Sequence, residues 1–173
     1  MDLKELETIY FSVEGDVSVN NENVPIINLM NNLKNKYFIR EKDTSSVYHL
    51  ANVFVSNLVL SLLEIGTSYL KDMGLSEKEA LNAIYPLIKG NIKNISEKGF
   101  MDSLTGPVAR GDVNTIKRHL GSVKQGDKEI YKELSLNLLK LVQIKNAKNM
   151  STEAFASTSK KYSEINQLLG GIE

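Results

Sequence analysis

LANVFVSNLVLSLLEIGTSYL, which spans Leu50–Leu70, is the stretch that decides the fold. Its apolar residues fall on more than one face of a helix, so we expect a helix over 44–72 that neighbouring helices bury on several sides. Asn52, Asn57 and Glu64 interrupt the stretch and would be costly in hydrocarbon, which favours a buried helix over a membrane span. We therefore expect no membrane contact.

Further helices are predicted after this stretch. Gly74 is expected to end the long helix, and the capping box Ser76–Glu79 is expected to open the next one. Pro86 removes one backbone donor, so this second helix should kink near Asn82 and end within 94–99.

The remaining C-terminal part reads as two long helices, a linker and a short helix. A loop over 101–112 leads to a helix that Asp112 begins, and an amphipathic helix follows over 127–145. Residues 151–161 are expected to be a polar linker, and Tyr162–Leu169 a last short helix.

The N-terminal forty residues have a different pattern. Tyr10–Asp16 mixes aromatic and β-branched residues before Gly15, which indicates a strand that runs into a turn. Asn23 as N-cap and Pro25 as first residue indicate a helix over Val24–Asn35, and a second strand is predicted at Tyr37–Arg40. Two strands bury too little surface to be stable alone, so this unit needs a partner.

The composition narrows the function classes. The chain has 173 residues, enough for one domain with a small appended unit, and no cysteine, which excludes a thiolate metal site. Its 21 basic residues balance 21 acidic ones, which disfavours nucleic-acid binding. No carboxylates are spaced to complete a metal site around His49 or His119. No export signal is visible, so we expect a cytoplasmic protein.

The first group of candidate functional residues lies on the long helix. His49, Asn52 and Ser56 are three and four residues apart and share a face, next to Tyr48 and Asn57. Either these groups satisfy one another in a core network, or they line a cleft in which a histidine titrates near neutral pH.

Two further groups lie in loops. Arg110, within Leu104–Asp112, is placed to grip a carboxylate or phosphate, or else to brace the loop by pairing with Asp112, Glu14 or Asp16. The carboxylates of Glu14 and Asp16 read as a solvated turn, and His119 as a structural residue.

Four segments follow one another in an order that one protein family shares. They are YFSVEGD from Tyr10, YHLANVFVSN from Tyr48, PLIKGNIKN from Pro86, and LTGPVARGD from Leu104 with TIKRHL after it. Over roughly Tyr10–Leu141 the chain resembles the C-terminal domain of the Rossmann-like proteins that carry domain of unknown function 2520. The resemblance implies a mainly α fold, the helical C-terminal domain of the 6-phosphogluconate dehydrogenase superfamily, with a small strand–helix–strand unit before it.

The resemblance also implies a missing partner domain. Pyrroline-5-carboxylate and ketopantoate reductases are similar in layout, with an N-terminal Rossmann domain that binds NADP and a helical domain that forms a homodimer. Here the first strand lies a few residues after Met1, so the Rossmann domain is expected to be encoded separately or to have been removed. Residues 1–42 would extend the Rossmann sheet, and residues 43–173 would dimerise and bind a small anionic substrate. No cofactor is expected on this chain alone.

Residues that match the family motifs are the implied site residues. His49 is implied as a general acid and Asn57 as a group that orients the substrate. The implied substrate-binding residues are Tyr48, Ser56, Asn94, Thr105, Gly106, Arg110 and Asp112. Ser45 stands where family members commonly carry a lysine, and Lys42 lies one turn away as a substitute.

These observations support two hypotheses. The first is the dimerisation and substrate-binding domain of an NADP-dependent oxidoreductase, inactive without its Rossmann domain. The second is a non-catalytic dimeric interaction or small-acid-binding module, which Ser45 and the absence of a GxGxxG motif favour. A free-standing enzyme of unrelated chemistry has least support, because the sequence has no HExxH, GxSxG or P-loop.

Overall fold

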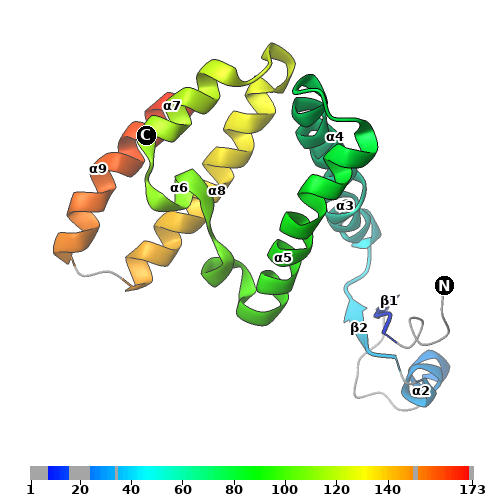
Figure 1. The fold of residues 1–173 in the computed structure, drawn as a ribbon. Helices are drawn as coiled ribbons and strands as arrows, with labels where there is room; N and C mark the ends of the chain where they lie inside the picture. Colours follow the sequence, from blue (N-terminus) through cyan, green and yellow to red (C-terminus); the bar gives the residue numbers. More distant parts are fainter. Residues whose placement is uncertain (1–7, 16–23, 34, 150–151, 172–173) are drawn as a thin grey trace. The chain divides into compact units, whose positions relative to one another are not determined.

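The computed structural model describes residues 8–15, 24–33, 35–149 and 152–171. It divides into two compact units, Met1–Gly66 and Thr67–Glu173. The fold is mainly helical with a small strand–helix–strand unit near the N-terminus, as predicted (Figure 1). The domain boundary expected after residue 42 falls between the second strand and the helix that follows, and it stays a prediction.

The first unit begins with two parallel strands and the helix between them. β1 (Phe11–Glu14) pairs with β2 (Tyr37–Arg40), and α2 (Pro25–Asn32) connects them. The register places Glu14 opposite Arg40 at the carboxyl ends of the strands. α2 starts at a proline, as predicted, with Val24 at the N-cap position. The expected cap residue Asn23 lies outside the described residues.

The predicted long helix is two helices, which corrects the single helix expected over 44–72. α3 (Ser45–Val55) and α4 (Asn57–Asp72) meet at Ser56, whose φ of −117° and ψ of −71° depart from helical values. The Ser56 hydroxyl donates a hydrogen bond to the Asn52 carbonyl at 2.6 Å, and serine bonds of this kind bend helices.

The prediction that these helices are buried is wrong for the single chain. α3 has no buried residue, and Thr67 is the buried residue of α4. Within the described part of the chain, Ser45–Asp72 is long and apolar enough to cross a membrane, and only 6% of its most apolar window is buried. The apolar pattern of the sequence shows which helix faces favour burial. It does not show whether these faces pack against the same copy of the chain or against another surface.

The second unit opens with α5 (Glu77–Ser103), which begins at the predicted capping box. The Glu79 carboxylate accepts a hydrogen bond from the Ser76 backbone N–H at 2.8 Å. The kink predicted near Asn82 is instead at Gly99, whose φ of 76° and ψ of 174° lie outside the helical region. Pro86 lies inside the helix without interrupting it, whereas glycine readily adopts a positive φ.

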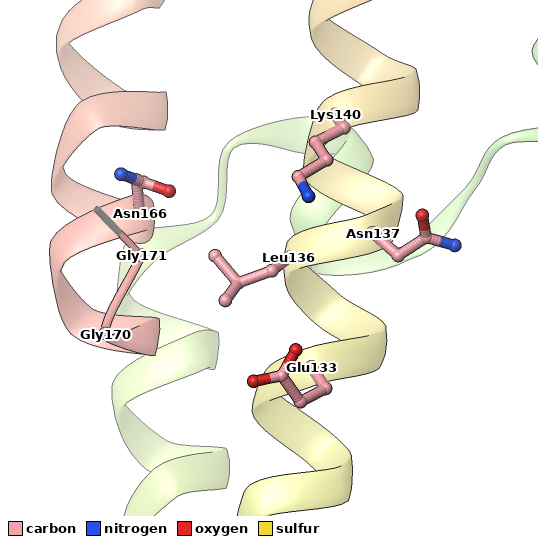
Figure 2. Close-up of a pocket in the computed structure, with 7 residues that line it drawn as sticks. All are labelled: Glu133, Leu136, Asn137, Lys140, Asn166, Gly170 and Gly171. Atoms are coloured by element: carbon pink, nitrogen blue, oxygen red, sulfur yellow. The ribbon is translucent and has the colours of Figure 1, made fainter. Parts of the chain in front are cut away.

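The rest of the second unit is helical as well. It consists of α6 (Gly106–Arg110), α7 (Val113–Ser122), the 3-10 turn η1 (Gln125–Asp127), α8 (Lys128–Asn149) and α9 (Thr152–Leu169). The loop expected over 101–112 therefore contains a short helix, which is too short to show an apolar repeat. The polar linker expected over 151–161 is helical from Thr152, because apolar contacts further along α9 stabilise the whole helix. α8 and the end of α9 border a cavity (Figure 2).

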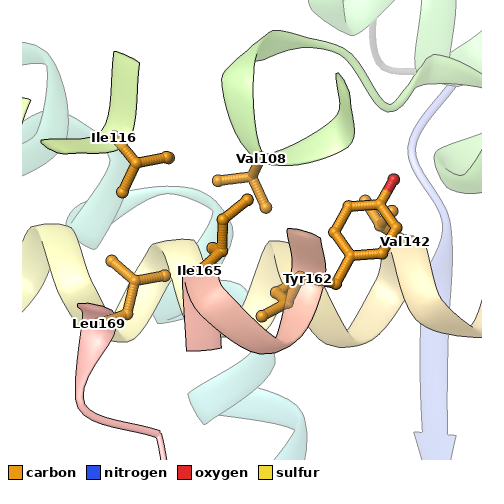
Figure 3. Packing of buried hydrophobic residues seen from close by; sticks show 7 residues of the cluster. Val108, Ile116, Val142, Tyr162, Ile165 and Leu169 are labelled. Carbon is orange, nitrogen blue, oxygen red and sulfur yellow. The ribbon is translucent and has the colours of Figure 1, made fainter. Parts of the chain in front are cut away.

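Helices α6 to α9 enclose one hydrophobic core (Figure 3). Tyr162, Ile165 and Leu169 come from one face of α9 at spacings of three and four, and they meet Val108 of α6 and Ile116 of α7. Leu139 and Val142 of α8 complete the buried cluster. The largest fully buried side chains of the described chain lie in this core, except Ile27 on α2.

A polar clasp ties the end of α4 to the turn before α8. The Tyr69 hydroxyl donates to the Asp127 carboxylate and accepts from the Lys124 backbone N–H, both at 2.9 Å. The Lys124 ammonium lies 2.6 Å from the Asp72 carboxylate and 4.7 Å from the centre of the Tyr69 ring. The hydrogen bond to Asp72 raises the pKa of Lys124. The clasp joins segments that are 55 residues apart.

The core predicts a mutational contrast on the C-terminal helices. Ile165→Ala is expected to destabilise the chain by about 2–5 kcal/mol, because it leaves a cavity among fully buried side chains. Ile144→Ala, at a half-exposed position of α8, is the matched control, and it is expected to lower the free energy of unfolding by at most about 1 kcal/mol. Urea unfolding followed by circular dichroism measures both, and equal losses would contradict the assigned core.

Candidate functional site

The predicted site residues of the first unit lie on α3 and at the start of α4. The Asn52 amide donates to the Tyr48 carbonyl at 2.8 Å, and the Ser56 hydroxyl also reaches the Asn57 side chain at 3.0 Å. His49, Asn52, Ser56 and Asn57 are exposed. Within this unit Asn52 and Ser56 bond to their own helix at the surface, so the buried core network considered for this group is not seen here.

A partly buried ion pair at the strand ends was missed by the sequence analysis. The Arg40 guanidinium lies 2.9 Å from the Glu14 carboxylate and donates to the Thr44 hydroxyl at 3.3 Å. It also lies 4.8 Å from the centre of the Tyr48 ring, and its Nε is buried without a hydrogen-bond partner. Glu14 thus holds Arg40 rather than forming a solvated turn; Asp16 lies outside the described residues.

The strand register is the signal that would have found this pair. Glu14 and Arg40 are 26 residues apart in the sequence, and only parallel pairing of β1 with β2 places them side by side. The pair connects the strand unit to the first turn of α3. Tyr48 is consequently held from one side by a cation and from another by the edge of Phe38, whose ring centre is 6.0 Å away.

The position of the family lysine is at the start of the same helix. Ser45 is the first residue of α3, and Lys42 lies in the turn before it. Asp43 in this turn has a φ of 61°, a left-handed conformation that is uncommon for residues other than glycine. Lys42 is exposed and makes no hydrogen bond or ion pair with another described residue.

The second predicted group lies in the loop around α6. Thr105 occupies the N-cap position of α6, Gly106 begins the helix with a φ of 91°, and Arg110 ends it. The Arg110 side chain is exposed and makes no hydrogen bond or ion pair with another described residue, although its charge, after the hydrogen bonds from Thr115, helps to lower the pKa of Asp112. It is a cation available to a ligand.

Asp112 caps the helix that follows, as predicted. Its carboxylate accepts from the Thr115 backbone N–H at 3.0 Å and from the Thr115 hydroxyl at 2.8 Å. These two hydrogen bonds, the hydroxyl first, lower the pKa of Asp112. The carboxylate therefore already caps α7, and Arg110 is the exposed cation of the loop.

The site residues fall into two groups that belong to different compact units. Tyr48, His49, Ser56 and Asn57 belong to the first unit, whereas Asn94 and the residues Thr105, Gly106, Arg110 and Asp112 belong to the second. Asn94 is exposed on α5. None of these residues borders the cavity between α8 and α9.

The other histidine pairs with a tyrosine. His119 Nδ1 lies 3.0 Å from the Tyr131 hydroxyl, and burial raises the pKa of Tyr131. This contact joins α7 to α8, in keeping with the structural role expected for His119. Among the described residues no cluster of three or more histidine or acidic side chains could hold a metal ion.

The Asp112 cap predicts a pH-dependent stability difference. Asp112→Ala is expected to lower the melting temperature at neutral pH, because α7 loses a charged acceptor at its first turn. The pKa of Asp112 is lower when folded, so this stabilisation is complete above the ordinary pKa of 3.8 and is lost as the pH falls through the folded value.

Thermal unfolding of the wild type and of Asp112→Ala at neutral and acidic pH measures this difference. The gap between the two is expected to narrow in acid, while Asn114→Ala, an exposed neighbour in the same turn, should show little change at either pH. A gap that is equally wide in acid would contradict a charged cap.

Comparisons with known proteins place the chain in a family. No curated protein matches it. Among solved structures, protein TM1727 from Thermotoga maritima is similar, with a TM-score of 0.69 and 30% sequence identity over 83% of this chain. The chain spans 57% of the length of that protein. The model of a family described as domain of unknown function (DUF2520) matches residues 9–138, and the chain belongs to this family.

Proposed function

We propose that this chain is the dimerisation and substrate-binding domain of an NADP-dependent oxidoreductase, which a Rossmann domain completes. The observation that carries the proposal is the uncovered apolar surface of α3, α4 and α5. A soluble protein rarely leaves so many large apolar side chains in water unless another surface covers them.

The apolar side chains on α3 and α4 are the first part of that surface. Phe54 is 58% exposed and Val55 74%, although the sequence places them in the most apolar stretch of the chain. The other exposed apolar residues of these two helices are Val47, Leu50, Leu58, Leu60 and Leu62. The hydrophobic effect favours covering them, by about 25 cal/mol for each Å² of apolar surface removed from water.

α5 contributes a stripe with the spacing of a helix-packing seam. Leu81, Tyr85, Ile88, Ile92 and Ile95 follow one another at alternating intervals of four and three residues. Tyr85 and Ile92 are more than 60% exposed, at 61% and 64%. A second copy of the chain would supply the same helices, and a two-fold axis would let each copy cover the other.

The two-stranded sheet supports the second half of the proposal. Two parallel strands alone offer few hydrogen bonds and have edges that can accept a further strand. A Rossmann domain would add its strands at such an edge. The relative from Thermotoga maritima is longer than this chain, which covers 57% of it. The remaining length is enough for a further domain.

Arg110 is the residue that we assign to the substrate. It is exposed, makes no hydrogen bond or ion pair with another described residue, and ends the short helix α6, which Thr105 caps. A guanidinium can bind a carboxylate through two parallel hydrogen bonds. Arg110 would hold a small acid in this way. The roles proposed for His49, as a proton donor, and for Asn57, as a group that orients the substrate, concern the other unit.

The alternative is a dimeric module without redox chemistry that binds a small acid. Ser45, in place of the lysine, favours it, because the exposed Lys42 lies in a turn rather than on α3. In this alternative the surfaces for dimerisation and for anion binding are retained, and no proton donor is required.

Supplying a Rossmann domain distinguishes the two. An NADP-binding Rossmann domain would be fused to the N-terminus of this chain, and NADPH binding and oxidation would be followed with a panel of keto acids and imines. The proposal predicts NADPH oxidation by the fusion and none by the chain alone. Binding of an acid without oxidation would support the alternative.

The dimer surface predicts an effect of single charges. Leu62→Lys or Ile92→Lys is expected to convert dimers to monomers, because an unpaired charge buried in an apolar interface costs several kcal/mol. Asn94→Lys adds the same charge on the opposite side of α5 and should leave the mass unchanged. Light scattering measures the mass, and circular dichroism checks folding; folded variants that remain dimeric would contradict this surface.

Arg110 predicts a loss of binding without a loss of stability. Arg110→Ala is expected to weaken binding of small carboxylates by about tenfold or more, because one charge-assisted contact is lost. Its melting temperature should stay close to that of the wild type, since the side chain makes no bond to another described residue. Calorimetry with oxaloacetate tests the first point; a strongly destabilised variant would indicate a bracing role.

A further inference from the structure

A cavity of about 510 Å³ lies between α8 and the end of α9, and none of the site residues discussed above borders it. We refer to it as the α8–α9 cavity. Its volume is in the range of small-molecule sites in proteins. Figure 2 shows that Leu136 points from α8 toward α9, while Asn166 and the glycines Gly170 and Gly171 form the opposite wall.

The wall on α9 depends on a glycine. The Gly171 N–H donates to the Asn166 carbonyl at 2.9 Å, and the Gly170 N–H donates to the Gln167 carbonyl at 3.1 Å, which ends the helix with a reversal of the backbone. A Cβ at Gly171 would overlap the Asn166 side chain. The bare backbone at Gly171 therefore allows the Asn166 amide to lie at the wall of the cavity.

The wall on α8 carries two opposite charges. Glu133, Leu136 and Lys140 are three and four residues apart and so lie on one face. Glu133 and Lys140 are seven residues apart, which separates their backbone positions by about 10 Å along the helix. Neither charged group makes a hydrogen bond or ion pair with another described residue. Leu136 lies between them.

We propose that the α8–α9 cavity binds a small zwitterion whose amino group and carboxylate are separated by an apolar chain. Its ammonium would bind the Glu133 carboxylate, and its carboxylate would bind the Lys140 ammonium and the Asn166 amide. The apolar chain would lie against Leu136. The separation of the two charges favours an ω-amino acid over an α-amino acid, whose charges are too close together to reach both ends.

Titration with 6-aminohexanoate tests this site on the full chain. The ligand is expected to shift the backbone amide NMR signals of residues 133–140 and 166–171, and to bind about tenfold more tightly than hexylamine, hexanoate or glycine at equal ionic strength. Equal affinity for the single-charge analogues, shifts spread over the whole surface, or no binding would overturn the proposal.

Three variants locate the ligand. Glu133→Gln and Lys140→Gln each remove one charge and should weaken binding about tenfold. Gly171→Ala changes no charge but should weaken binding by displacing Asn166. Lys148→Gln, an exposed lysine elsewhere on α8, is the matched control and should bind as the wild type does. Because none of these residues lies on α3, α4 or α5, failure here would leave the proposed dimer untouched.

Discussion

One copy of the chain leaves many large apolar side chains in contact with water, and the rest of the structure has to be understood from this constraint. They line α3, α4 and α5, whereas α6 to α9 enclose a core of buried apolar side chains and leave fewer of the described ones exposed, namely Ile130, Leu134, Leu138 and Ile144 of α8. The first three helices therefore have a stronger reason to pack against another surface than the last four, which already share a buried core. In this account α3, α4 and α5 provide the surface for association, and α6 to α9 provide the stable core.

The two polar connections that the structure adds lie at the ends of the exposed helices. Arg40 and Glu14 join the strand unit to the first turn of α3, and the Tyr69 clasp joins the last turn of α4 to the loop before α8. Each is a hydrogen-bonded charge group between distant parts of the sequence. Both would hold the helix ends in place without using the apolar side chains that are available to a partner.

Several helix starts could be predicted from the sequence, because strong local capping signals determine them. Pro25 and the capping box at Ser76 set helix starts that the structure confirms, as does the Asp112 cap. The bend at Ser56 and the short α6 were missed, because one depends on a side-chain bond to the helix backbone and the other is too short for a repeat. The Arg40–Glu14 pair could be predicted only from the strand register. The exposure of α3 could not be predicted, because the sequence does not show whether the same copy of the chain or another surface covers its apolar side chains.

The molecular mass of the wild-type chain in solution, by light scattering on a sizing column, tests the central claim most directly. If α3, α4 and α5 form an interface between copies, the mass will be near twice 19.3 kDa over a wide range of concentrations. A stable, soluble species of 19.3 kDa under the same conditions would contradict the account, because the apolar helices would then remain in water without a partner.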